Sequence, residues 1–186
     1  MIQTGKIGDR VGASTDGRAE LANRLGLAGR WEIECFDADG NLKWVDYIDN
    51  LVVDAGLNDM LDKWLKGSAY TAAFYVGLVS STPTIAAGDT MSSHAGWTDN
   101  TTYSNATRPA LTLGTVASKS VDNSASKAVF NINGTATIGG AFATTSNTKG
   151  GTTGTLVSAG AFSGGNKSVS SGDTLNVQLT YTGSSS

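Results

Sequence analysis

The clearest pattern along the chain is an alternation of apolar and polar residues in the first third of the sequence. Trp31, Ile33 and Cys35 alternate with two glutamates, which is the period-two pattern of a strand with one buried side. Turn-forming residues follow at 37–41, and the extended pattern then resumes. Residues 30–48 are therefore predicted to form a β-hairpin.

A different period follows, and it predicts one short α-helix at about 55–66. Apolar residues recur there at intervals of three and four, which places them on one face of a helix. Asp54 precedes the segment, two lysines near its end suit the helix dipole, and Gly67 is placed to end it. The apolar residues of this predicted face are Ala55, Leu57, Met60, Leu61, Trp64 and Leu65.

The rest of the chain consists of short apolar segments separated by turn residues. A long polar loop is expected from about residue 81 to residue 106. Because no amphipathic helix lies between the later segments to make a parallel crossover, the predicted fold is mainly β, an antiparallel β-sandwich or jelly-roll-like domain. The further predicted strands are 72–80, 110–118, 128–132, 135–143, 154–162 and 174–181.

The first 28 residues form a region of their own. Five glycines are spaced among scattered charges there, with a short helix-like run at about 19–27. We predict an extended N-terminal arm at 1–28 that becomes ordered by lying across a neighbouring subunit. A single β-rich domain is predicted at 29–186, since a chain of 186 residues suits one domain.

Composition narrows the classes of function. A net charge of -3 and a pI near 5.0 disfavour nucleic acid as a partner, because binding it normally needs clustered Lys and Arg. No segment approaches the roughly 18 consecutive apolar residues of a membrane helix, so no membrane partner is expected. One Cys and one His allow neither a disulfide nor a structural zinc site within one chain, and no cofactor is expected.

Candidate catalytic residues are few. Ser93, His94 and Asp99 supply the residue types of a hydrolase triad. Adjacent residues on an extended segment point to opposite sides, however, and a triad needs its base within hydrogen-bond reach of its nucleophile. We therefore expect no enzyme activity and interpret His94 as a residue that orders its loop.

A calcium site is also not predicted. Asp37, Asp39 and Asn41 match the first ligand positions of a calcium-binding loop. Leu42 then occupies the place of the sharp-turn glycine, and Ile48 stands where a bidentate glutamate belongs. A hairpin turn is the better interpretation of these residues.

Four short motifs stand out in the middle of the sequence. They are Asp-Asn-Leu-Val-Val-Asp-Ala-Gly-Leu-Asn-Asp-Met-Leu at 49–61, Phe-Tyr-Val-Gly-Leu at 74–78, Ala-Gly-Asp-Thr-Met-Ser-Ser-His-Ala-Gly-Trp at 87–97, and the segment 103–109. In this order, and followed by a Gly/Ser/Thr-rich β region, they resemble small β-rich virion structural proteins of tailed bacteriophages, of the capsid decoration, cement or minor capsid type. The resemblance covers about residues 30–186 and supplies no catalytic residues.

The resemblance implies a non-enzymatic virion structural protein that is made in the host cytoplasm and carried in the virion. Our first hypothesis is a capsid decoration or cement protein that binds the major capsid protein lattice, stabilises the head and forms a homo-oligomer, either a trimer or a dimer. The alternatives are a tail, neck or fibre-adaptor protein, and a receptor- or glycan-binding module of the virion. Strands poor in Lys, Glu and Pro also predict sheet edges that a partner covers.

Four residues are candidates for the interface. Trp97, Tyr103 and Trp44 are proposed as anchors because interfaces concentrate binding energy in a few aromatic residues, and His94 lies close to Trp97 in the sequence. In the glycan-binding alternative, Trp97 and Tyr103 stack on sugars. The alternative that each aromatic residue belongs to the core stays open.

Overall fold

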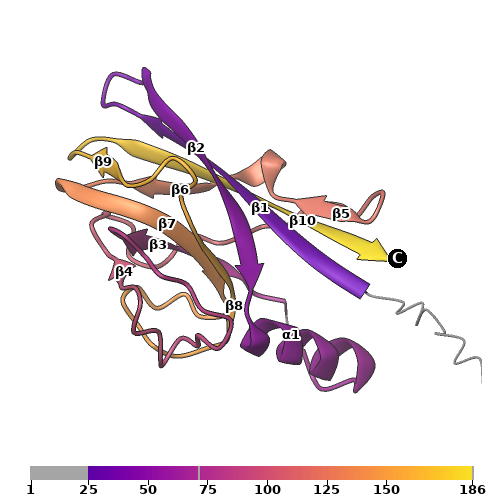
Figure 1. Cartoon of the computed structure of the whole chain (residues 1–186). Helices are drawn as coiled ribbons and strands as arrows, with labels where there is room; N and C mark the ends of the chain where they lie inside the picture. The colour runs from indigo at the N-terminus through magenta and orange to yellow at the C-terminus, as the bar shows by residue number, and fades with distance from the viewer. Residues whose placement is uncertain (1–24, 71, 186) are drawn as a thin grey trace, which may run out of the picture.

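The segment of alternating residues forms the hairpin of β1 (Leu25–Phe36) and β2 (Leu42–Val52) in the computed structural model, which describes residues 25–70 and 72–185 (Figure 1). Asp37 closes the turn, because its Oδ1 accepts hydrogen bonds from the backbone N–H groups of Asp39 and Asn41 at 3.0 and 2.8 Å. The predicted hairpin is confirmed, and the Asp37 carboxylate stabilises its turn.

The described strands form one antiparallel sheet that curls into two layers (Figure 1). One layer holds β1, β2, β5 (Ser120–Asp122), β6 (Ala128–Asn131) and β10 (Thr174–Ser185). The other holds β3 (Tyr75–Ser80), β4 (Asp99–Asn100), β7 (Ala136–Thr144), β8 (Leu156–Ala161) and β9 (Lys167–Val169). The end of β2 pairs with β8 and joins the layers. The predicted mainly β, antiparallel class is confirmed, whereas a jelly-roll topology is not.

Two apolar clusters hold the layers in place. The main core lies between the layers and includes Trp31 and Ile33 from β1 and Leu78 from β3, all fully buried. A second cluster lies on the other side of β3 and β7, where Trp97 and Phe142 pack together under the loop that follows β3. Both sides of these two strands are therefore buried.

Some predicted boundaries are wrong. Residues 110–118 form no strand; Leu111 instead donates a backbone hydrogen bond to Phe74 beside the start of β3. Residues 25–28, which we assigned to the N-terminal arm, begin β1 and pair with β10. The rest of the predicted arm, 1–24, lies outside the described residues. The strands β4, β5 and β9 were not predicted, because two or three residues are too few to show a period.

The edge of β6 is covered within the chain. The Asn105 side chain donates from Nδ2 to the carbonyl oxygen of Val129 and accepts at Oδ1 from the N–H of Asn131, both at 3.0 Å. A side-chain amide thus replaces a neighbouring strand, so this edge does not need a partner chain.

The predicted helix is confirmed, and one glycine sets its distance from the sheet. Helix α1 (Asp54–Met60) continues as a π-helical turn η1 (Leu61–Leu65), and Gly67 follows with a φ of +75°. Gly56 is buried against β8, where a Cβ atom would overlap the backbone carbonyl of Val157. Only glycine allows this approach, so it determines which side of α1 faces the sheet.

A buried carboxylate closes the gap that opens where β2 diverges from β8. Asp46 accepts hydrogen bonds from Ser163 Oγ and the N–H groups of Tyr47 and Gly164, and lies 2.8 Å from Lys167 Nζ. Burial alone would raise the pKa of Asp46, but these hydrogen bonds, led by that from Lys167, lower it below its ordinary value of 3.8. The ionised form therefore stabilises the fold.

We predict that Gly56→Ala destabilises the protein by about 1–3 kcal/mol, because a backbone carbonyl cannot move aside as a side chain can. The gain in helix propensity from Gly to Ala, about 1 kcal/mol, is too small to offset this cost. Gly88→Ala is the matched control, since a Cβ there meets no atom within 4 Å. Urea denaturation of both variants checks the prediction, and equal stability would contradict it.

We predict that acid destabilises the protein partly through Asp46. Because its pKa is lower in the folded than in the unfolded protein, its stabilisation is complete above the unfolded pKa and is lost as the pH falls through the folded pKa. Asp46→Asn should cost about 1–3 kcal/mol at pH 7 and reduce the loss of stability below about pH 4. Thermal melts from pH 7 to pH 2 measure both effects; parallel pH curves for the two proteins would exclude this role.

Candidate functional site

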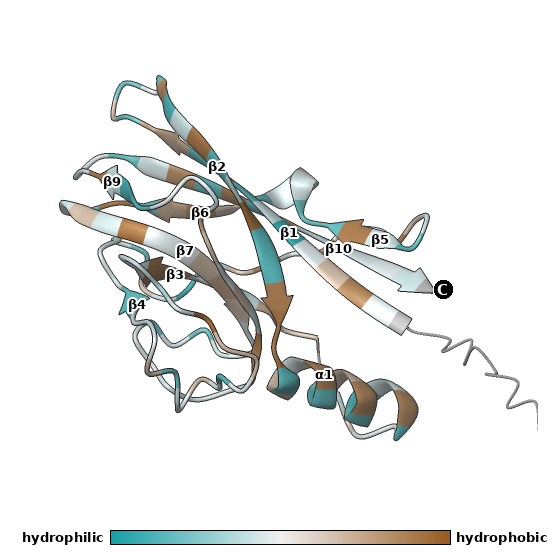
Figure 2. Ribbon diagram, viewed as in Figure 1, coloured by the Kyte–Doolittle hydropathy of each residue, from teal (hydrophilic) through white to brown (hydrophobic). Residues whose placement is uncertain are grey.

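The most unusual surface lies on the helical segment α1–η1. Five large apolar side chains point to one side of this segment and are exposed, and we call this surface the α1 face. Trp64 is 77% exposed and Leu65 is 66% exposed. Figure 2 shows an apolar side and a polar side along the helix. The residues of the α1 face are Leu57, Met60, Leu61, Trp64 and Leu65.

The exposure of this face follows from the way the helix is attached. An amphipathic helix normally turns its apolar stripe toward the core. Here the buried position of the helix is Gly56, which lies to one side of the stripe. The close approach at Val157 fixes this rotation. Large apolar patches of this kind mark protein or membrane contacts on soluble domains.

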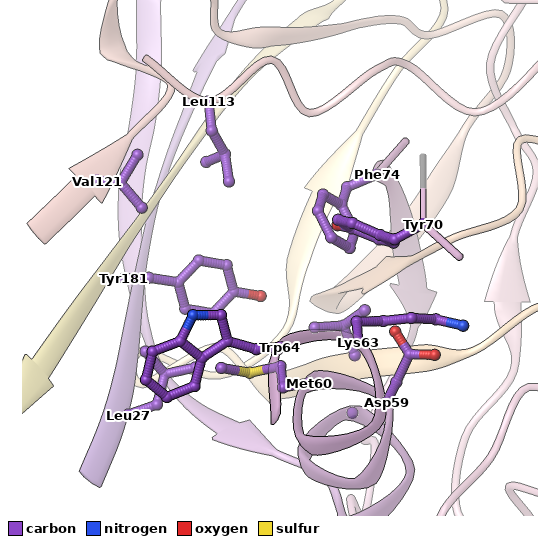
Figure 3. Close-up of a pocket in the computed structure, with 12 residues that line it drawn as sticks. Leu27, Asp59, Met60, Lys63, Trp64, Tyr70, Phe74, Leu113, Val121 and Tyr181 are labelled. Carbon is purple, nitrogen blue, oxygen red and sulfur yellow. The ribbon is translucent and has the colours of Figure 1, made fainter. Parts of the chain in front are cut away.

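A groove of about 430 Å³ lies between the helix and the sheet, and we call it the α1 groove (Figure 3). Met60 and Trp64 line it from the helix, and Leu27 and Tyr181 line it from β1 and β10. Phe74, Leu113 and Val121 complete its apolar wall. Because Met60 and Trp64 also belong to the α1 face, the groove and the face form one continuous apolar surface.

The α1 groove offers few polar groups to a ligand. The Tyr181 hydroxyl is engaged with Ser158 Oγ at 2.8 Å, and burial raises the pKa of Tyr181 to about 12. Asp59 and Lys63 are the charged residues among those that line it. Such a groove suits the apolar side chains of a protein partner, because a small polar ligand would find almost nothing to fix its orientation.

Two of the residues predicted for the interface are in fact core residues. Trp97 is 4% exposed; its Nε1 donates to Asp89 Oδ2 at 2.9 Å, and its ring packs on Phe142. Tyr103 is fully buried with its ring edge-to-face on Phe130. The prediction that these two side chains anchor a partner is therefore wrong, because this chain's own layers already surround them.

The other two predicted residues are partly buried and lie apart from the α1 groove. His94 stacks on Trp97 with ring centroids 3.9 Å apart, and its Nδ1 lies 3.0 Å from the Trp97 carbonyl oxygen. Trp44 packs edge-on against Phe162 and donates from Nε1 to the carbonyl of Ser168. Both side chains have partners within the chain, and their interface role stays a prediction.

Asp99, one of the three residues with the types of a hydrolase triad, is engaged elsewhere. Asp99 Oδ2 accepts from Arg108 Nη2 at 2.8 Å and from the N–H of Gly150 at 3.0 Å. Burial raises the pKa of Asp99, and the hydrogen bond and charge of Arg108 oppose this rise. Arg108 is itself buried and also donates to the carbonyl groups of Ser146 and Gly151. This ion pair connects two loops and gives Asp99 a structural role.

The cysteine is not placed for reactivity either. Cys35 is buried in the core, and burial, with the nearby charge of Asp173, raises the pKa of its thiol to about 12. The thiolate form, which is the nucleophile, is therefore suppressed at neutral pH.

The helical pattern of the sequence already places the residues of the α1 face on one apolar side of the predicted helix. The spacing of Leu57, Leu61 and Trp64 predicts an apolar face, but the sequence does not show whether that face is covered. The sequence feature that accounts for the exposure of the face is Gly56, a small residue beside the apolar stripe. Its effect on the rotation of the helix can be seen only from its contact with β8.

We predict opposite outcomes for two tryptophan substitutions. Trp97→Ala should destabilise the fold by about 3–5 kcal/mol, because it empties a core position and removes the partner of Asp89. Trp64→Ala should change stability by less than about 1 kcal/mol, since the side chain is mostly exposed. Chemical denaturation measures both, and a large loss for Trp64→Ala would show that Trp64 is part of the core.

Of the residues that the structure describes, no three His, Cys, Asp or Glu side chains gather to hold a metal ion. No helix in the described ranges is long and apolar enough to cross a membrane. Comparisons with protein-family models, with curated proteins and with solved structures find no match to this chain.

Proposed function

We propose that this protein is a non-enzymatic structural component of a tailed-phage particle. The preferred role is that of a capsid decoration or cement protein that binds the major capsid protein lattice and stabilises the head. The motifs at 49–61, 74–78 and 87–97 support the assignment to a virion, through their resemblance to small virion proteins.

The single observation that carries a binding role is the α1 face with its groove. Trp64 and Leu65 are largely exposed, which is unfavourable in water unless a partner covers them. Tryptophan is also among the residues that contribute most to protein interfaces. The surface therefore supports assembly with other protein chains.

Two alternatives to a capsid decoration protein are a tail, neck or fibre-adaptor protein and a glycan-binding module, and the structure supports them to different degrees. A tail, neck or fibre-adaptor protein would use the same face, and its position on the particle would distinguish it from a head protein. A glycan-binding module was proposed because Trp97 and Tyr103 would stack on sugars. Both side chains are buried, so the loop lacks the aromatic surface on which that proposal depended.

Particles provide the test of this function. The phage whose genome encodes this sequence is purified, and its heads and tails are separated and analysed by mass spectrometry. We expect the protein on heads, in many copies. Its absence from both heads and tails would contradict the proposed function, and its presence on tails alone would favour the adaptor role.

The contribution of the α1 face to assembly on the particle, directly or through self-association, is tested with purified protein and particles that lack the protein. Leu61→Glu and Trp64→Ala should each weaken binding at least about 30-fold, which corresponds to the ~2 kcal/mol of an interface hot spot. Leu42→Glu is the control, because Leu42 is 55% exposed at the far end of β2. Equal loss of binding in the control would contradict a specific role for the α1 face.

A further inference from the structure

We propose that the α1 face binds the α1 face of a second copy of this chain, with the two helical segments antiparallel about a two-fold axis. This inference rests on the proposed function in so far as the face is a protein contact, and it names the partner. A two-fold contact uses the same surface on both copies, so the surface has to be complementary to itself.

The first argument is the order of charges along the helical segment. The acidic residues Asp54 and Asp59 lie in its first half, and the basic residues Lys63 and Lys66 lie at its end. An antiparallel arrangement places the acidic half of each copy opposite the basic end of the other. A parallel arrangement would place like charges together.

Within the helical segment one carboxylate, that of Asp62, is shared by the two lysines, so the basic end keeps a net positive charge. Asp62 lies 3.2 Å from Lys66 and 3.5 Å from Lys63. Asp54 and Asp59, in contrast, form no ion pair with any described residue. They are therefore free to face the lysines of a second copy, and the antiparallel helix dipoles add to the attraction.

The second argument is the area. The five side chains of the α1 face expose roughly 550 Å² if a large side chain exposes about 200 Å² in full. A standard interface buries about 800 Å² on each partner, of which somewhat more than half is apolar. The α1 face thus supplies about the apolar area that a stable dimer needs, without any other surface of the chain.

The third argument is the position of the groove relative to Trp64. The groove runs beside both halves of the helical segment, because Gly56 and Met60 line it from the first half and Trp64 lines it from the second. Figure 3 shows Met60 and Trp64 side by side in it. In an antiparallel pair, Trp64 of one copy lies over the first half of the other. The partner's tryptophan then covers the apolar wall that a single copy leaves open.

Disulfide cross-linking tests the arrangement directly. Leu61 lies midway between Leu57 and Leu65, so the two-fold axis passes near it, and Leu61→Cys should cross-link two copies under mild oxidation. Leu65→Cys alone should not, because its copies lie at opposite ends of the interface. A mixture of Leu57→Cys and Leu65→Cys should form the mixed dimer. The native Cys35 is buried and gives a low background.

The outcomes separate the possible partners. Cross-linking of Leu65→Cys as efficient as that of Leu61→Cys would contradict the antiparallel arrangement. Cross-linking of Leu61→Cys no more efficient than that of Asn58→Cys, which lies outside the α1 face, would exclude the second copy as the partner. The proposed function has its own test in purified particles, so a monomer found on heads would overturn this inference and leave that function intact.

Sedimentation equilibrium supplies the second measurement. The wild type should dimerise, and Leu61→Glu should weaken dimerisation at least about 30-fold, while Leu42→Glu leaves it unchanged. Lys66→Glu should weaken it by about two- to fivefold, and the added Asp59→Lys should restore it. A wild type that stays monomeric, or that forms trimers unaffected by these changes, would overturn the inference.

Discussion

The close approach of Gly56 to the backbone of Val157 determines how the rest of this surface is presented. The helical segment follows β2, the strand that joins the two layers, and so begins where the sheet passes from one layer to the other. Contact through a glycine brings the backbone of α1 against β8 and turns the large apolar residues to the side. The core is complete without them, and they remain exposed beside a groove.

Several buried or partly buried polar side chains of the chain stabilise the fold. Asp46 closes the gap beside β2, Asp99 and Arg108 connect two loops, and Asn105 covers the edge of β6. Each of these hydrogen bonds and ion pairs joins separate segments of the same chain. The apolar surface of α1–η1 is different, because its large side chains are exposed. An exposed apolar surface of this size is suited to contact with another protein chain.

Much of the fold could be predicted from the sequence, but features that depend on tertiary contacts could not. The alternation around Trp31 and the spacing around Leu61 identified the hairpin and the helix, because both patterns run over many residues. The strand predicted at 110–118 is absent, because its alternating residues pack against the start of β3 without forming a strand of their own. The prediction of Trp97 and Tyr103 as interface anchors was wrong for a general reason. The local sequence around an aromatic residue in a polar loop is the same whether the loop packs on its own sheet or on a partner chain. The exposure of Trp64 depends on a contact between residues about a hundred positions apart, and no local pattern contains it.

Hydroxyl-radical footprinting tests most directly whether the α1 face is a protein contact in the assembled particle. The oxidation rates of Trp64 and Met60 are compared between protein diluted to the monomer and intact particles. Leu42 and Val116, which are exposed elsewhere, serve as internal references. If the face is a contact, Trp64 and Met60 are protected about tenfold or more in particles, while the references react at similar rates in both states. Equal oxidation of Trp64 in the monomer and in particles that contain the protein would contradict this account.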